Sequence, residues 1–217
     1  MCLVLEDVTF AYPGGAVILE GASLTITQGG YYLVRGPSGS GKSTLLRLLC
    51  RLEEPQSGRI VYQETPVSEM EPARLRRTVA YVQQMPTLLK ASVRDNLLLP
   101  LQFKANSGLE PPDDGTLNRM LGSFLLDGVT LDAMADSLSV GQAQRVCLIR
   151  SLLLRPEVLL MDEPTASLDA KSAQVVLDKA AELSRDGMTV VMISHSETTP
   201  EGVTDLIRIN GRKLEFA

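Results

Sequence analysis

The sequence predicts an α/β fold in which a mixed or parallel sheet carries a tight glycine-rich loop. Three observations support this prediction. An apolar run at 31–34 leads through the glycine-rich stretch 36–44 into a helix-forming run. The continuous apolar runs 158–161 and 189–193 are typical of parallel strands that are buried on both faces. Between about residues 92 and 156 the pattern is mostly helical, which indicates a helical part inserted between the strands.

The N-terminal segments are expected to add antiparallel strands. Residues 3–10 read as the opening strand, which the turn Pro13-Gly14-Gly15 ends, and residues 17–26 read as a strand pair. Further short strands are expected at 58–62 and 79–82.

The C-terminal half supplies the remaining elements in order. A loop-rich interruption at 106–115 breaks the helical stretch, and residues 170–184 read as an amphipathic helix. The runs 207–209 and 213–216 flank Asn210-Gly211, which is a hairpin signal.

Composition narrows the function classes. The chain has 217 residues and a formal net charge of −5, so its charge does not suggest a nucleic-acid partner. No apolar run approaches the roughly 18 residues that span a bilayer, and the N-terminus lacks the pattern of a secretory signal. The three cysteines, Cys2, Cys50 and Cys147, are odd in number and far apart, which favours reduced cytosolic thiols over a disulfide framework or a zinc site.

The glycine-rich stretch fits the pattern G-x-x-x-x-G-K-[ST] of a P-loop, which holds nucleotide phosphates. Its glycines allow positive φ, so that the backbone amides can point inward towards anionic oxygens. Lys42 is expected to reach the β- and γ-phosphates, and the Ser43 hydroxyl to bind Mg²⁺. A glycine-rich turn without a ligand is the alternative, and the strand–loop–helix context argues against it. The expected phosphate-binding residues are Gly36, Pro37, Ser38, Gly39, Ser40, Gly41, Lys42, Ser43 and Thr44.

Two acids follow the apolar run 158–161. A carboxylate at a strand end opposite a P-loop is where P-loop NTPases hold Mg²⁺, so Asp162 is a candidate metal ligand. Glu163, one residue further on, is a candidate general base for an attacking water molecule. Acids at strand ends are common, and a solvated loop start is the alternative interpretation of this pair alone.

A later run, Leu138-Ser139-Val140-Gly141-Gln142, resembles the L-S-G-G-Q signature of ATP-binding cassette (ABC) ATPases. The resemblance extends along the whole chain in the family's order. Tyr12 resembles the aromatic residue that stacks on adenine, and Gln84 resembles the glutamine of the Q-loop. Residues 166–169 match the D-loop, and His195, the single histidine, matches the switch histidine. Each match alone would also suit an ordinary packing or loop residue, but six elements in this order indicate the family.

Two positions in these motifs need a decision. Gln83 competes with Gln84 for the Q-loop position, and we favour Gln84 because the family usually places one residue between the apolar run, here 79–82, and the glutamine. Val140 stands where the family usually has glycine. Its Cβ is expected to restrict the backbone, and this puts in question how tightly the signature loop contacts phosphate.

The resemblance implies a single ABC ATPase domain over residues 1–217, with a P-loop NTPase core at about 1–84 and 157–217 and a helical subdomain at about 85–156. It also implies a head-to-tail homodimer that binds two ATP molecules at its interface. One subunit would supply the P-loop with Gln84, Asp162 and His195. Gln84 would contact either the attacking water or Mg²⁺, which Ser43 and Asp162 would also bind. The other subunit would supply Ser139, Gly141 and Gln142.

Within the family, the resemblance favours the ATPase subunit of a transporter that acts on a separate membrane permease from the cytoplasmic face of the membrane. Residues 84–103 are similar to predicted metal or iron exporter ATPases of the Fet/Ybb type. An iron–sulfur cluster assembly ATPase is the alternative, since it too is a single small cassette. Its partner is soluble, so co-purification with membranes or with a soluble scaffold separates the two. The apolar stretch 85–91, with Leu88 and Leu89, is expected either to pack within the helical part or to form a groove for the permease.

Overall fold

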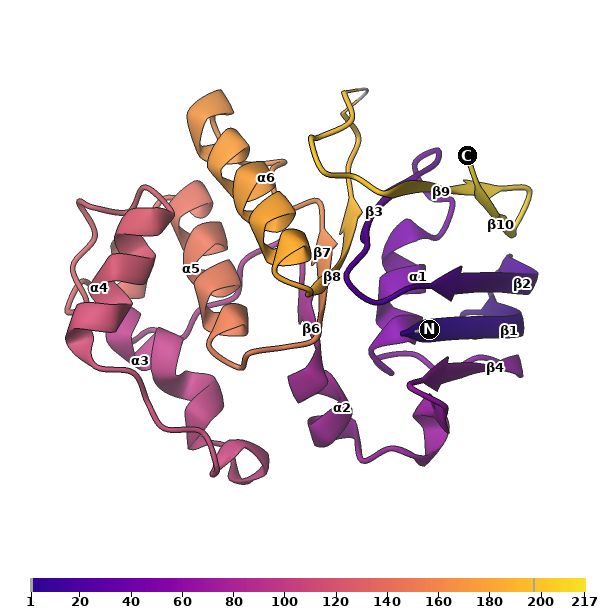
Figure 1. Cartoon of the computed structure of the whole chain (residues 1–217), viewed down its shortest axis with the longest axis horizontal. Coiled ribbons are helices and arrows are strands. Elements are labelled where there is room, and N and C mark those ends of the chain that lie inside the picture. Colours follow the sequence, from indigo (N-terminus) through magenta and orange to yellow (C-terminus); the bar gives the residue numbers. More distant parts are fainter. Residues whose placement is uncertain (1, 197) are drawn as a thin grey trace.

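The computed structural model describes residues 2–196 and 198–217 (Figure 1). Its strands are β1 (Leu3–Ala11), β2 (Val17–Ile26), β3 (Tyr31–Arg35), β4 (Ser57–Tyr62), β5 (Thr65–Pro66), β6 (Val79–Val82), β7 (Val158–Asp162), β8 (Thr189–Ile193), β9 (Asp205–Asn210) and β10 (Lys213–Phe216). Its α-helices are α1 (Lys42–Leu49), α2 (Pro72–Thr78), α3 (Val93–Leu98), α4 (Asp114–Ser123), α5 (Val140–Leu152) and α6 (Ala170–Arg185). Short 3₁₀ turns lie at η1 (Val67–Glu69), η2 (Leu99–Gln102), η3 (Lys104–Asn106) and η4 (Ala135–Ser137).

Two sheets form the scaffold, in agreement with the predicted α/β class. The larger sheet has the strand order β10-β9-β3-β8-β7-β6 and is parallel except for the β9–β10 hairpin. The smaller sheet, β2-β1-β4-β5, is antiparallel. Figure 1 shows α3, α4 and α5 at one end of the molecule and β1, β2 and β4 at the other.

The larger sheet separates two hydrophobic cores, because side chains alternate between the faces of a strand. In β7, Val158 and Leu160 join the core that contains α1 and the small sheet. Leu159 and Met161 join the core beneath α3, α4, α5 and α6. Every residue of β7 and β8 is buried, as the apolar runs predicted.

Local details differ from the sequence-based expectations. Residues 17–26 form one continuous strand rather than a pair, and its pairing with β1 contains register shifts. The predicted loop 106–115 ends early, because the Asp113 side chain accepts a hydrogen bond from the Thr116 amide and so caps α4. The hairpin turn is centred one residue later than predicted, since Gly211 and Arg212 both have positive φ.

The three cysteines are buried and free. Burial raises the pKa of each thiol, that of Cys50 to about 11, so all three behave as small apolar residues. Among residues 2–196 and 198–217 we find no helix with the length and apolar content that a membrane span requires.

Candidate active site

Most of the predicted site residues follow the carboxyl ends of neighbouring parallel strands. The P-loop follows β3, Gln84 follows β6, Glu163 follows β7 and His195 follows β8. Because β6, β7, β8 and β3 are consecutive neighbours, these strand ends meet at one edge of the sheet. Crevices at this edge are where open α/β sheets bind ligands.

The P-loop is built for close backbone approach. Gly39 and Gly41 have φ of 75° and 98°, and a Cβ at Gly41 would lie 2.2 Å from a methyl carbon of Ile18. No side chain caps the start of α1, so its first amides face the loop. Lys42 folds back over the loop, and its ammonium donates to the carbonyl oxygens of Gly36 and Pro37 at 2.9 Å each. A bound phosphate would compete with these carbonyl groups for the ammonium.

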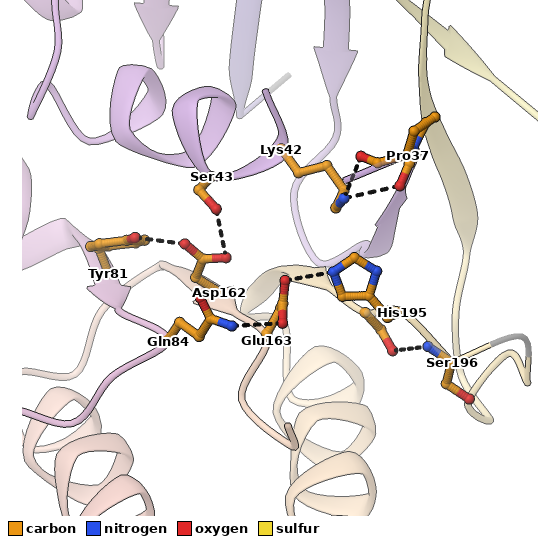
Figure 2. A network of polar contacts seen from close by, with 11 residues as sticks. Pro37, Lys42, Ser43, Tyr81, Gln84, Asp162, Glu163, His195 and Ser196 are labelled. Atoms are coloured by element: carbon orange, nitrogen blue, oxygen red, sulfur yellow. Dashed lines mark hydrogen bonds and ion pairs between the residues drawn. The ribbon is translucent and has the colours of Figure 1, made fainter. Parts of the chain in front are cut away.

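Asp162 is held by two hydroxyl groups (Figure 2). Ser43 donates to its Oδ1 at 3.0 Å, and Tyr81 donates to its Oδ2 at 2.9 Å. The carboxylate is almost fully buried, with 2% of the residue exposed. Burial and the negative charge of Asp162 together raise the pKa of Tyr81, so its hydroxyl keeps its proton.

Glu163 lies between the Q-loop and the switch histidine. Its Oε1 is 2.7 Å from His195 Nε2, and its Oε2 accepts from Gln84 Nε2 at 2.8 Å (Figure 2). Its φ is 49°, in the left-handed region that few residues other than glycine adopt. Such a conformation costs on the order of 1–3 kcal/mol and persists only where surrounding contacts impose it.

The two glutamines considered for the Q-loop point to different partners. The Gln83 side chain donates to the Thr87 hydroxyl, and the backbone carbonyl oxygen of Gln83 accepts from Gln144 at 3.1 Å. Of the two, only Gln84 reaches Glu163. Gln84 therefore stays the candidate for the Q-loop position.

Tyr12 lies beside the P-loop helix. Its ring meets that of Phe10 edge-to-face, with centroids 4.9 Å apart, and its hydroxyl is 3.4 Å from both the Thr44 hydroxyl and an Arg47 nitrogen. An open pocket of about 520 Å³ extends from this tyrosine across the P-loop. Its lining comprises Tyr12, Ile18, Ser38, Gly39, Gly41, Lys42, Ser43, Thr44, Gln84, Glu163 and His195. All of these except Ile18 were predicted from the sequence.

The signature residues lie elsewhere on the chain. Ser139 caps α5 through a reciprocal pair of bonds, in which Gln142 N donates to the Ser139 hydroxyl and Ser139 N donates to Gln142 Oε1. Ser139, Gly141 and Gln142 do not line the chain's own pocket. Gly141 packs against the D-loop, where an added Cβ would lie 3.2 Å from the carbonyl oxygen of Ser167.

Val140 does not strain the signature segment. It is the first residue of α5, is half exposed and is not among the residues with positive φ. The backbone restriction expected from its Cβ is therefore compatible with the conformation that this position adopts.

Sequence reasoning missed Arg47 and Tyr81 as neighbours of the site. The hydroxyl groups of Tyr12 and Tyr81 raise the pKa of Arg47, so its guanidinium stays charged. Tyr81 was visible only as a residue of a short apolar strand, because its contact with Asp162 depends on how β6 and β7 align.

Comparison with known families gives the site its context. The family model described as ABC transporter matches residues 19–166, which is most of the chain. The chain belongs to the ABC transporter family. As an ABC ATPase it binds and hydrolyses ATP, and cassettes of this kind form dimers.

Its relatives within the family differ in length. It is 37% identical to "ABC transporter I family member 17" of Arabidopsis thaliana over 94% of this chain and 76% of the relative. It is 35% identical to "Probable iron export ATP-binding protein FetA" of Escherichia coli over 90% of this chain and 85% of the relative. "Protein STAR1" of Oryza sativa is 39% identical, but this ABC ATPase spans only 55% of its length.

Solved structures agree with this assignment. A dimeric ATP-binding cassette in a post-hydrolysis state with ADP and Pi, MJ0796, superposes with a TM-score of 0.85 at 26% identity, covering 98% of this chain and 96% of that one. An ATP-bound bacterial Atm1-family exporter superposes at 0.86 and 24% identity, over 98% of this chain and 38% of that one, and shows the shared fold.

Proposed function

We propose that this ABC ATPase powers transport through a separate membrane permease, from the cytoplasmic face of the membrane. The convergence of Lys42, Asp162 and Glu163 at the carboxyl edge of one sheet carries the ATPase part of the proposal. Lys42 and the partly exposed Glu163 line one pocket, and the buried Asp162 carboxylate accepts from Ser43, which also lines it. These groups suit hydrolysis of a nucleoside triphosphate by positioning and electrostatics.

The donor atoms around Ser43 fit Mg²⁺, which prefers oxygen ligands and keeps several waters and phosphate oxygens. The Ser43 hydroxyl and the Asp162 carboxylate lie within hydrogen-bond distance, and the Gln84 amide lies close by across Glu163. In the described residues there is no cluster of three or more His, Cys, Asp or Glu side chains that would form an all-protein cage. When bound, Mg²⁺ would neutralise phosphate charge.

Each of the remaining polar side chains has a role in this proposal. Glu163 takes a proton from the attacking water, and Gln84 and His195 orient its two carboxylate oxygens. Lys42 leaves its loop carbonyl groups to bind phosphate oxygens. Ser139 and the first amides of α5 of a second copy contact the γ-phosphate from the opposite side.

Three exposed apolar side chains in the helical part support the permease as partner. Met85, Leu89 and Met134 are exposed to 66%, 51% and 46%. Leu88, by contrast, is partly buried against the core of the helical part. Exposed apolar groups of this kind suit a short apolar helix of a membrane partner. The two interpretations of the 85–91 segment therefore divide between Leu88, which packs inside, and Leu89, which faces out.

Metal or iron export is the proposed direction and substrate. It is supported by the similarity to the E. coli relative whose name describes probable iron export, which matches most of both chains. The cassette itself contributes energy rather than substrate contacts, so the substrate proposal is tested through the partner and not through the ATPase site.

Membrane association tests the transporter proposal. In its native cells the tagged wild-type chain is expected in the membrane fraction, and Leu89→Glu is expected to release most of it, because truncating or charging a central interface residue costs about 2 kcal/mol or more. Basal ATPase activity of the purified variant should stay within about twofold, since Leu89 lies outside the pocket. Leu52→Glu is the matched control, because Leu52 is a leucine of similar exposure, 45%, that follows α1 and lies outside the 85–91 segment. A wild-type chain that stays in the supernatant with a soluble scaffold would favour an assembly ATPase instead.

At the neighbouring position, Leu88, a charged substitution is expected to destabilise the fold. Leu88→Glu would place a carboxylate against the apolar core of the helical part, which costs several kcal/mol unless it is paired. We expect a clearly lower melting temperature for Leu88→Glu than for Leu89→Glu, measured by thermal unfolding of the purified chains. Equal melting temperatures would show that Leu88 does not pack in that core.

Tyr12 provides a prediction on ATP affinity. Tyr12→Ala is expected to weaken ATP binding about fivefold or more, because stacking of a base on an aromatic ring contributes about 1–3 kcal/mol. Tyr12→Phe and Tyr12→Trp should bind nearly as well as the wild type, since the hydroxyl contacts at 3.4 Å are weak and the ring is kept. Fluorescence titration with a labelled ATP measures this. If all variants bind equally, Tyr12 does not contact the base.

A further inference from the structure

The Asp162 carboxylate has one partner whose part in the reaction is not explained by the motifs. Ser43 occupies Oδ1 from the P-loop helix, as expected for a shared metal site. The Tyr81 hydroxyl occupies Oδ2 at 2.9 Å from the other side (Figure 2). With 2% of Asp162 exposed, little water can replace that bond.

The sheet places Tyr81 at this carboxylate. In the parallel pair β6–β7, Tyr81 aligns with Leu160 and Val82 with Met161. Leu160 and Asp162 point to the same face of β7, because side chains alternate, and Tyr81 packs in the same core as Leu160. A ring that starts beside Leu160 therefore reaches along that face to the strand end, where Asp162 lies.

The hydroxyl proton of Tyr81 points to Asp162. The Tyr81 hydroxyl donates to Asp162 Oδ2, and an ionised carboxylate only accepts hydrogen bonds. In a buried site such a bond is stronger than it would be in water.

We propose that Tyr81 is a positioning residue for the carboxylate of Asp162. The inference rests on the proposed function, in which Asp162 and Ser43 hold Mg²⁺ with the nucleotide. The bond at Oδ2 fixes the rotation of the carboxylate and leaves Oδ1 directed at Ser43. Partners of this kind typically alter metal affinity or activity by about 10- to 100-fold.

A matched pair of tyrosines allows a sharp test. Tyr62 donates to Glu157 Oε2 at 2.7 Å, which is the same type of bond at the opposite end of β7. Tyr81→Phe and Tyr62→Phe each remove one hydroxyl and keep the ring. Binding of a fluorescent ATP analogue to the purified chain is measured in EDTA and in excess Mg²⁺, and the ratio of the two dissociation constants gives the gain in affinity that Mg²⁺ provides.

We expect Tyr81→Phe to lower this gain about tenfold while the affinity in EDTA stays within about twofold of the wild type. Tyr62→Phe should keep the full gain, although it loses a comparable bond. A full gain in Tyr81→Phe would overturn the proposal. If thermal unfolding shows that Tyr81→Phe does not fold, a full gain in Tyr81→Leu, which also lacks the hydroxyl, would overturn it equally.

Asp162→Asn separates this inference from the function on which it rests. If Asp162→Asn keeps the Mg²⁺-dependent gain, Asp162 is not at the metal site, and both the site assignment and the role of Tyr81 fail. If Asp162→Asn removes the gain and Tyr81→Phe does not change it, the site assignment stands and only the role of Tyr81 fails.

Discussion

Replacing Glu163 by glutamine is expected to lower the ATPase rate by a factor of about 10² to 10⁴ while ATP still binds. Glutamine keeps the size of the side chain but cannot accept the proton of the attacking water. The contacts around residue 163 can be kept, because an amide offers one acceptor and one donor to His195 and Gln84, whose own ring and amide can reorient. The loss is therefore expected in turnover rather than in folding or binding.

Trapping of the dimer is the second readout of this variant. If bound ATP holds two cassettes together until it is hydrolysed, Glu163→Gln should elute as a dimer with ATP and Mg²⁺ on gel filtration, whereas the wild type should return to monomers. Glu157→Gln is the matched control, since Glu157 is a carboxylate at the other end of β7 that accepts from Tyr62 and Gln63. Turnover of Glu163→Gln near the wild-type rate would remove Glu163 from the role of base.

The parts of the site that the sequence predicted share one property, which is that they are local in sequence. The P-loop needs only its glycines and the helix that follows them, and Ser139 with Gln142 forms a capping pair three residues apart. Asp162 and Glu163 are marked by the end of an apolar run. Such signals depend on periodicity and on residue type at short spacing, which a single sequence contains.

The parts that the sequence did not predict depend on contacts between distant segments. Tyr81 reaches Asp162 only because β6 and β7 pair in one register, and Arg47 meets Tyr81 only because α1 packs on that face. Likewise, Leu88 and Leu89 differ in burial although they are adjacent and alike. The separation of β1, β2, β4 and β5 into their own sheet has the same origin, since strand pairing over long distances decides it.

Complementation between two inactive chains is expected if ATP is hydrolysed at sites shared by two subunits. Lys42→Ala removes the ammonium that the P-loop places at the phosphates. Ser139→Arg removes the cap of α5 and puts a bulky cation in place of a hydroxyl. Each homodimer would then have two defective sites, so each variant alone should be nearly inactive.

A mixed dimer contains one intact site. One of its sites combines both lesions, and the other combines the intact P-loop of the Ser139→Arg chain with the intact signature of the Lys42→Ala chain. In mixed dimers purified through both tags, one of the two sites is intact, so about one half of the wild-type activity is the expected upper limit. The position of Ser139, outside the pocket of its own chain, is the structural reason for expecting this.

Ser92→Arg is the control for the structural cost of the signature variant. Ser92 caps α3 with the same reciprocal arrangement, in which Asp95 takes the place of Gln142. It should therefore lose about 1 kcal/mol of stability, as Ser139→Arg does, and keep its ATPase activity. The measurement is the ATPase rate of co-expressed chains that carry two different tags and are purified through both. If doubly tagged Lys42→Ala and Ser139→Arg dimers form and show no activity above that of the single variants, then the sites are not shared in the proposed way.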